Sequence, residues 1–235
     1  MNSLDETRRR SLEDRANEAR KKRSASAQPL VVEFAGSPKS GKSTNIDILC
    51  HFFKRMGFKI WAPTEGASKR TPYSLKRDLV AFNTWSLNYA ISELLVAYHN
   101  IERHDLIVLD RGPFDSLAWM TVLHGRGELG LDELNTIKAF ALHPKWSKLI
   151  SRVYLFKCEA DTSLRRELES KLTHGQGTAM NESMLNDLLD KYNSLLNELR
   201  GYPVKTFDTT TTKGPLDTAE PIAQDILEIM EAANG

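Results

Sequence analysis

The chain of 235 residues has only two cysteines and almost no net charge. Cys50 and Cys158 each lie in an apolar stretch, so we expect buried free thiols and no disulfide framework. The six histidines show no metal-ligand spacing with these cysteines. A net charge of +1 gives no reason to expect a nucleic-acid partner. No apolar run is long enough to span a bilayer and no signal peptide is recognisable, so we expect a cytoplasmic protein without a membrane contact.

Residues 1–28 carry many charges of both signs and few apolar side chains. This composition indicates a charged N-terminal tail, helical or disordered, that takes no part in catalysis. Strand-like and helix-like patterns alternate after it, which predicts one α/β domain over residues 29–235. Because parallel strands need crossover connections, we expect a parallel sheet with helices on both faces. The five strand candidates are Leu30–Ala35, Phe58–Ala62, Leu106–Leu109, Val153–Phe156 and Val204–Phe207.

A loop with the pattern Gly-x-x-x-x-Gly-Lys-Ser lies between the first strand candidate and a helical pattern. The backbone N–H groups of such a loop and the positive end of the following helix surround phosphate groups. Lys42 would reach the β- and γ-phosphates of ATP, and the Ser43 hydroxyl would bind Mg²⁺. We therefore predict that ATP binds to Gly36, Ser37, Pro38, Lys39, Ser40, Gly41, Lys42, Ser43 and Thr44.

Carboxylates follow two of the strand candidates at the sheet edge where ligands bind in open α/β sheets. Asp110 ends the Leu106–Leu109 run and is our second metal-ligand candidate. Arg111 comes next, and its charge would stabilise a phosphoryl group in transfer. Glu65 occupies the equivalent place after the second strand candidate. It could accept a proton from an attacking hydroxyl or hold a substrate hydroxyl, and a turn glutamate in solvent is an equal alternative.

Residues 161–185 read as a helix, a loop of small residues and a second helix. This arrangement is typical of a lid that closes over phosphates and excludes water. Arg165 and Arg166 lie in its first helix, where we expect them to contact phosphate; solvated surface arginines are the alternative.

The phosphate loop, the Asp110-Arg111 pair and the arginine-bearing helix follow the order found in thymidylate kinases and deoxynucleoside kinases. The segment LIVLDRGPFDSLAWM resembles a thymidylate kinase stretch, and NTWSLNYAISELL is similar to the deoxynucleoside kinase helix that lines the nucleoside pocket. The resemblance covers roughly residues 30–230. It implies a P-loop NTPase three-layer sandwich with a five-stranded parallel sheet of order 2-3-1-4-5, helices on both faces and a helical lid. It also implies a homodimer.

By position, the resemblance assigns catalytic roles to Lys42, Glu65, Asp110, Arg111, Arg165 and Arg166. It assigns acceptor contacts to Glu65, Trp85, Asn88 and Arg111, and metal contacts to Ser43 and Asp110. The chain has Thr64-Glu65-Gly66 where thymidylate kinases have Arg-Glu-Pro-Gly-Gly, and Asp110-Arg111-Gly112 where deoxynucleoside kinases have Glu-Arg-Ser. These departures leave the acceptor open between a nucleoside and a nucleoside monophosphate.

The leading hypothesis is a kinase that transfers the γ-phosphoryl group of ATP to a nucleoside or nucleoside monophosphate. An ATPase or regulatory subunit that acts on a protein partner is the alternative, and a nucleotide-binding module without catalysis is a third. Phosphoryl transfer with a small acceptor, hydrolysis alone, and binding alone would distinguish the three.

Overall fold

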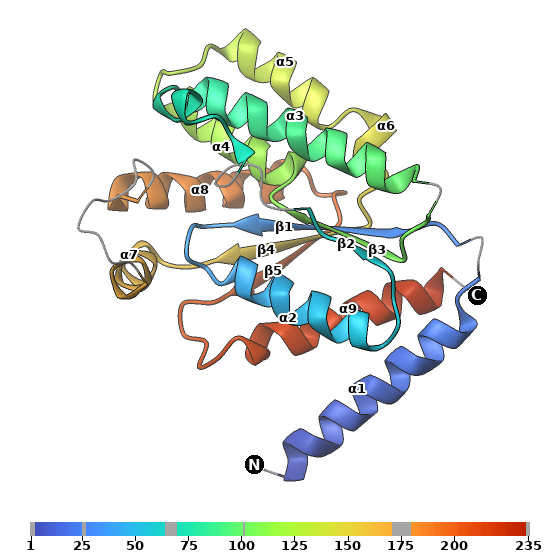
Figure 1. Ribbon diagram of the computed structural model, residues 1–235. Coiled ribbons are helices and arrows are strands. Elements are labelled where there is room, and N and C mark those ends of the chain that lie inside the picture. The colour runs from blue at the N-terminus through green and yellow to red at the C-terminus, as the bar shows by residue number, and fades with distance from the viewer. Residues whose placement is uncertain (1–2, 25–26, 64–69, 101, 171–179, 234–235) are drawn as a thin grey trace.

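The structure is a computed structural model that describes residues 3–24, 27–63, 70–100, 102–170 and 180–233. A five-stranded parallel sheet runs through its middle in the order β2-β3-β1-β4-β5 (Figure 1). The strands are β1 (Leu30–Gly36), β2 (Ile60–Trp61), β3 (Leu106–Asp110), β4 (Arg152–Lys157) and β5 (Val204–Asp208). The predicted strand order is confirmed, and each predicted run contains a strand, although only Ile60–Trp61 of the run Phe58–Ala62 belongs to one.

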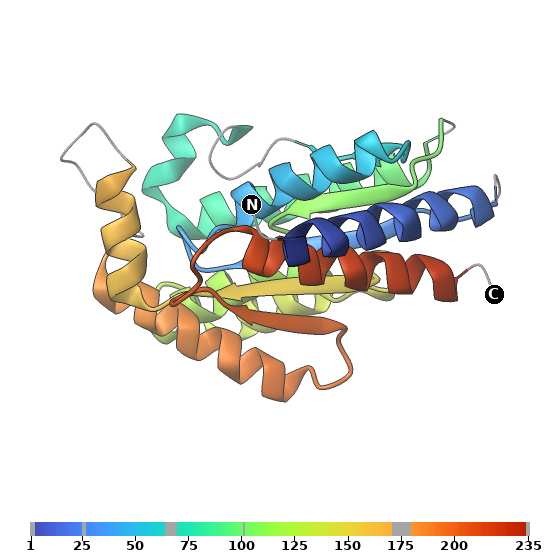
Figure 2. The same cartoon turned by 90° about the horizontal axis from the view of Figure 1, so that it is seen from below.

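Helices cover both faces of this sheet (Figures 1 and 2). Those packed on one face are α3 (Leu79–Tyr98), α4 (Pro113–Gly125), α5 (Leu131–Ala141) and α8 (Glu182–Glu198). Those on the other face are α1 (Ser3–Lys22), α2 (Lys42–Arg55) and α9 (Leu216–Ala232). The shorter helices are η2 (Tyr73–Arg77), α6 (Pro144–Ser147) and α7 (Ala160–Glu169). The three-layer arrangement predicted for a P-loop protein is therefore present.

Strand β1 lies at the centre of the sheet and is buried along its whole length. Successive side chains of a strand point to opposite faces, so Val31 and Ala35 pack in one core while Val32 and Phe34 pack in the other. Glu33 belongs by this alternation to the face that α4 covers. A charged residue in this position needs polar partners, because burial of an unpaired carboxylate is costly.

Helix α1 places the charged N-terminal segment against the domain. Ala16 and Ala19 are buried with α2 and α9, and Arg15 forms an ion pair of 2.6 Å with Glu231 of α9. Just beyond the helix, Arg23 pairs with Asp105 at 2.8 Å. Small apolar residues on one side of α1 therefore let a helix that is otherwise polar lie close to the core. Within the described residues, no helix has the length and apolarity required to cross a membrane.

Candidate functional site

The phosphate loop predicted from the sequence joins β1 to α2 (Figure 1). Gly36 ends β1 with a φ of 135°, and a Cβ atom there would lie 2.0 Å from the backbone oxygen of Phe156 on β4. Gly41 begins α2 in the left-handed conformation with a φ of 91°. Both positions require glycine, the first by close approach and the second by backbone geometry. The two glycines of the motif thus set the path of the loop.

Lys42 is directed back into the loop. Its Nζ donates hydrogen bonds to the backbone oxygens of Gly36 at 2.8 Å and Ser37 at 2.7 Å, and only 6% of the residue is exposed. A buried ammonium group needs such acceptors. The lysine therefore places positive charge at the centre of the loop.

Other side chains attach the loop to the elements around it. Thr209, which follows β5, donates its hydroxyl to the backbone oxygen of Ser40 at 2.9 Å. Asn45 of α2 donates to the oxygen of Gly41 at 3.0 Å and accepts from Thr218 of α9 at 2.8 Å. These bonds join the loop and the start of α2 to the segment after β5 and to α9.

Two oxygen-bearing side chains meet at the start of α2. The hydroxyl of Ser43 donates to Asp110 at the end of β3, with 3.3 Å between Oγ and Oδ2. Hydroxyl and carboxylate oxygens are the ligands that Mg²⁺ prefers. The two residues chosen from the sequence as metal ligands are thus adjacent in the fold, and their chemistry fits the ion.

Arg111 follows Asp110 in an unusual backbone conformation, with a φ of 64°. Its N–H donates to the backbone oxygen of Phe34 at 3.0 Å, and its Nη1 pairs with Asp115 at 2.7 Å. The guanidinium also lies 6.0 Å from the ring centre of Trp119. A left-handed non-glycine residue is strained and persists only where its surroundings fix it.

Three solved structures of deoxyadenosine kinase from M. mycoides are similar to this chain in fold. Their TM-scores with the chain are 0.58 for the complex with dATP, 0.60 for the complex with dCTP and 0.61 for the complex with dCMP and a flexible dCDP. Each is 16% identical in sequence, and the alignment covers 85% of this chain and 100% of the kinase. The fold is that of a P-loop deoxynucleoside kinase. No protein-family model and no curated protein matches the sequence.

Two buried carboxylates lie close to the phosphate loop and were not among the site residues predicted from the sequence. Asp115 on α4 is 1% exposed and accepts hydrogen bonds from the Gly36 N–H at 2.8 Å and the Tyr192 hydroxyl at 2.6 Å. Burial by itself would raise the pKa of Asp115, but the positive charges of Arg111 and Lys42 together with the hydrogen bonds from Tyr192 and Gly36 outweigh it, so the pKa is lowered. Asp115 is therefore an ionised group beneath the phosphate loop.

Glu33 of β1 is the second buried carboxylate, with no exposed surface. It accepts backbone N–H groups from Gly112, Phe114 and Asp115 at 3.1, 3.2 and 2.8 Å, which are unpaired donors at the start of α4. Burial raises its pKa to about 8, although these three hydrogen bonds act in the opposite direction. The signal in the sequence was an acidic residue within an otherwise apolar strand.

Arg165 and Arg166, which we predicted as lid arginines, lie on α7. Arg166 donates to the backbone oxygens of Lys39 in the loop at 3.3 Å and Thr209 at 2.7 Å. Lys39 in turn pairs with Glu167 at 3.0 Å, so two neighbouring residues of α7 hold Lys39 of the loop. Arg165 is exposed on the same helix. Residues 171–179 of the predicted lid lie outside the described residues.

The predicted acceptor residues are on α3 and after β2. Trp85 stacks on Tyr89 with ring centres 5.3 Å apart, and the Asn88 amide donates to the backbone oxygen of Thr84 at 2.8 Å. Trp85 and Asn88 are one helical turn apart, so they share a side of α3. Glu65 lies outside the described residues, so its position stays a prediction.

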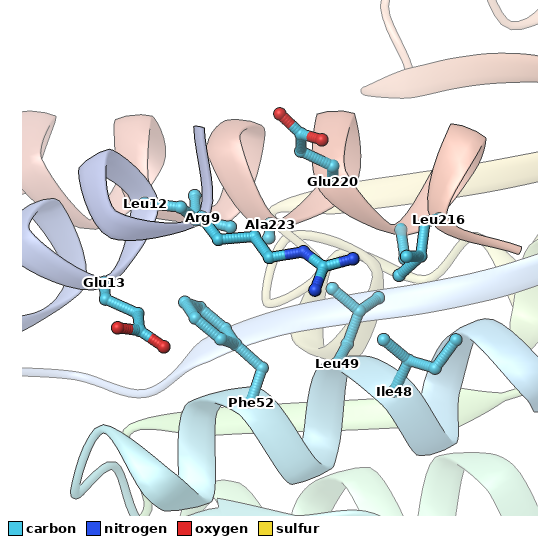
Figure 3. Close-up of a pocket in the computed structure, with 10 residues that line it drawn as sticks. Arg9, Leu12, Glu13, Ile48, Leu49, Phe52, Leu216, Glu220 and Ala223 are labelled. Carbon is cyan, nitrogen blue, oxygen red and sulfur yellow. The ribbon is translucent and has the colours of Figure 1, made fainter. Parts of the chain in front are cut away.

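A pocket of about 330 Å³ lies elsewhere in the P-loop kinase fold, between α1, α2 and α9 (Figure 3). Its floor is apolar, and Arg9 extends from α1 across it toward Leu49 and Leu216. The lining residues are Arg9, Leu12, Glu13, Ile48, Leu49, Phe52, Leu216, Ala219, Glu220 and Ala223. The pocket begins beyond the first turn of α2, so it is separate from the phosphate loop.

Proposed function

We propose that the protein transfers the γ-phosphoryl group of ATP to a nucleoside or nucleoside monophosphate. The observation that carries this proposal is the loop Gly36–Ser43, which joins a central strand to a helix in a P-loop kinase fold with Lys42 at its centre. The nucleotides bound in the structurally similar deoxyadenosine kinases support a nucleotide ligand here as well.

Charge stabilisation and positioning supply most of the catalysis in phosphoryl transfer. In our proposal the loop N–H groups and Lys42 hold the ATP phosphates, and Ser43 and Asp110 hold Mg²⁺. The ion, when bound, would neutralise charge on the phosphate oxygens. Arg111 would contribute its charge on the acceptor side, and Arg165 would reach the phosphates from α7.

Arg166 has a different proposed role, because its guanidinium already binds backbone oxygens. By joining Lys39 of the loop to Thr209, it would set the distance between the phosphate site and the segment after β5. We propose that this segment passes the adenine of ATP. Arg166 would then position both ends of the nucleotide.

The choice of acceptor depends on Glu65, Trp85 and Asn88. A nucleoside hydroxyl benefits from a base such as Glu65, whereas a monophosphate is already an anion and mainly needs cations such as Arg111. We expect Glu65→Gln to reduce transfer to a nucleoside far more than transfer to a monophosphate. Equal losses would mean that Glu65 only orders the pocket.

The deciding experiment uses γ-labelled ATP with Mg²⁺ and a panel of ribo- and deoxynucleosides and their monophosphates. Lys42→Ala should lower kcat by roughly 100- to 1,000-fold, in the range found when a preorganised charge-stabilising group is removed. Lys54→Ala is the matched control, because Lys54 is an exposed lysine in the last turn of the same helix. A Lys42 variant with full activity would exclude the loop from the mechanism.

The same experiment separates the alternatives. A labelled nucleotide product supports the kinase and identifies its acceptor. Labelled free phosphate with every acceptor would instead favour an ATPase or a regulatory subunit that acts on a protein partner. ATP binding without either product would favour a nucleotide-binding module.

A further inference from the structure

We infer that Asp115 is a positioning residue for phosphoryl transfer, because one buried carboxylate holds both the phosphate loop and Arg111. The inference rests on the proposed kinase function for its catalytic consequence. Asp115 itself lies beneath the loop, 1% exposed, and acts through the two groups that it binds.

The two oxygens of Asp115 bind different parts of the site. Oδ1 accepts the N–H of Gly36, the first residue of the phosphate loop, at 2.8 Å. Oδ2 accepts Nη1 of Arg111 at 2.7 Å. Because both bonds start from one rigid carboxylate, a shift of the loop relative to Arg111 would break one of them. The carboxylate therefore fixes the separation of the donor-phosphate site from the acceptor-side cation.

All three partners of the Asp115 carboxylate are hydrogen-bond donors, since Tyr192 also donates its hydroxyl to Oδ1 at 2.6 Å. A carboxylate accepts at both oxygens, but an amide accepts at only one. Asparagine would bring its NH₂ group against either Arg111 or the Gly36 N–H, whichever way the amide is turned. The site thus requires an ionised carboxylate, and an amide of the same shape does not replace it.

The position of Asp115 is itself fixed by Glu33 on the central strand. The Asp115 N–H donates to Glu33 Oε1 at 2.8 Å, and the N–H groups of Gly112 and Phe114 bind the same carboxyl group. The first turn of α4 is therefore attached to β1, which also leads into the loop. This short closed path of contacts explains how Arg111 can keep its strained backbone, with a φ of 64°.

The test compares Asp115→Asn with Tyr192→Phe. The tyrosine variant removes a bond to the same carboxylate but leaves the Gly36 and Arg111 bonds in place, so it controls for damage to the buried network. We expect Asp115→Asn to lower kcat about 100-fold, the scale of a misplacement of about 1 Å. We expect Tyr192→Phe to stay within about threefold of wild type, because neither bond to the reacting groups is lost. Urea unfolding shows which variants are folded at the assay temperature.

A double-mutant cycle with Arg111→Gln separates positioning from a general structural role. If Asp115 acts through Arg111, the double variant should lose little more activity than the worse single variant. Multiplicative losses in kcat, or equal losses in Asp115→Asn and Tyr192→Phe, would overturn the inference. So would a folded Asp115→Asn variant with wild-type kcat.

Two further measurements do not require the kinase reaction. Hydrogen exchange at the Gly36 amide should accelerate in Asp115→Asn and stay slow in Tyr192→Phe, and Kd for ATP should rise only in the first variant. A wild-type protein that binds ATP but transfers nothing would overturn the proposed function. These two measurements would still decide whether Asp115 holds the phosphate loop in place. If Asp115→Asn does not fold, Arg111→Gln replaces it in the test. Hydrogen exchange at the Gly36 amide should then stay slow although phosphoryl transfer falls, because the Gly36 bond uses the other carboxylate oxygen. Fast exchange in this variant would contradict the claim that Asp115 holds Gly36 and Arg111 through separate bonds.

Discussion

Glu33 makes the stability of the protein depend on pH in a defined direction. Its pKa is raised from the ordinary value of 4.5 to about 8, first by burial and also by the negative charge of Asp115. Between these two pH values the folded protein holds a proton that the unfolded chain releases. Unfolding is therefore favoured as pH rises, and the stabilising contribution of the neutral carboxyl is complete below pH 4.5 and lost by about pH 8.

The perturbation that isolates this effect is Glu33→Gln. One proton of difference changes the free energy of unfolding by about 1.4 kcal/mol per pH unit, so the interval between pH 4.5 and about 8 amounts to about 5 kcal/mol. The glutamine side chain does not ionise, but its NH₂ group would face the backbone N–H groups of the first turn of α4. We expect wild type to be the more stable protein near pH 5 and to lose this advantage steadily toward pH 8.

Urea unfolding of wild type and Glu33→Gln at half-unit steps from pH 4.5 to 9 measures the difference directly. Other titrating groups contribute equally to both proteins and cancel. Glu133→Gln makes the same chemical change at the exposed start of α5, where Glu133 accepts the Gly130 N–H at 2.7 Å, and so separates the effect of burial from the loss of a helix-terminal carboxylate. A difference between wild type and Glu33→Gln that stays constant across this range would refute the reasoning.

Three further predictions test packing and attachment. Gly112→Ala places a Cβ atom 2.6 Å from Cδ of buried Glu33 and should reduce the free energy of unfolding, measured in urea, by about 1–3 kcal/mol. An unchanged midpoint of the urea unfolding transition would mean that the carboxyl group can move aside. Ala16→Asp places a carboxylate in the buried contact between α1 and the domain, which should loosen α1 and speed tryptic cleavage within residues 3–22. Asn17→Asp on the exposed side of α1 should leave the cleavage rate unchanged, and equal rates for the two variants would contradict the docking of α1. Thr209→Val leaves a buried backbone oxygen of the loop without its donor and should cost about 1–3 kcal/mol in urea unfolding, and a neutral effect would remove this attachment from our account.

The strands could be predicted because parallel strands buried on both faces form short apolar runs. Each of the five runs contains a strand, and the crossover helices between them follow from the parallel direction. Ser43 and Asp110 could also be brought together in advance, since one follows a loop at the end of β1 and the other ends the neighbouring β3.

The buried network beneath the loop could not be predicted in the same way. Glu33 and Asp115 are 82 positions apart, and their link depends on the angle at which α4 leaves the sheet. Tyr192 comes from α8, which no local pattern connects to either. An acidic residue in an apolar strand was a visible signal, but its partners are three backbone N–H groups, which every sequence has.

The contacts of Arg166 with backbone oxygens could not be predicted for a related reason. Two adjacent arginines on a helix look equivalent in the sequence, but they project in directions about 100° apart. Arg166 binds the backbone oxygens of Lys39 in the loop and Thr209 after β5, and Arg165 is exposed. Telling the two arginines apart requires the orientation of α7, which depends on tertiary packing.

The docking of α1 has a practical consequence for the design of expression clones. A clone that starts at residue 29 would keep every strand of the sheet and the whole phosphate loop. It would also uncover the apolar side chains of α2 and α9 that Leu12, Ala16 and Ala19 now contact, and remove the partner of Glu231. Exposed apolar patches of this kind promote aggregation. The first 28 residues therefore belong in any protein sample made for assay.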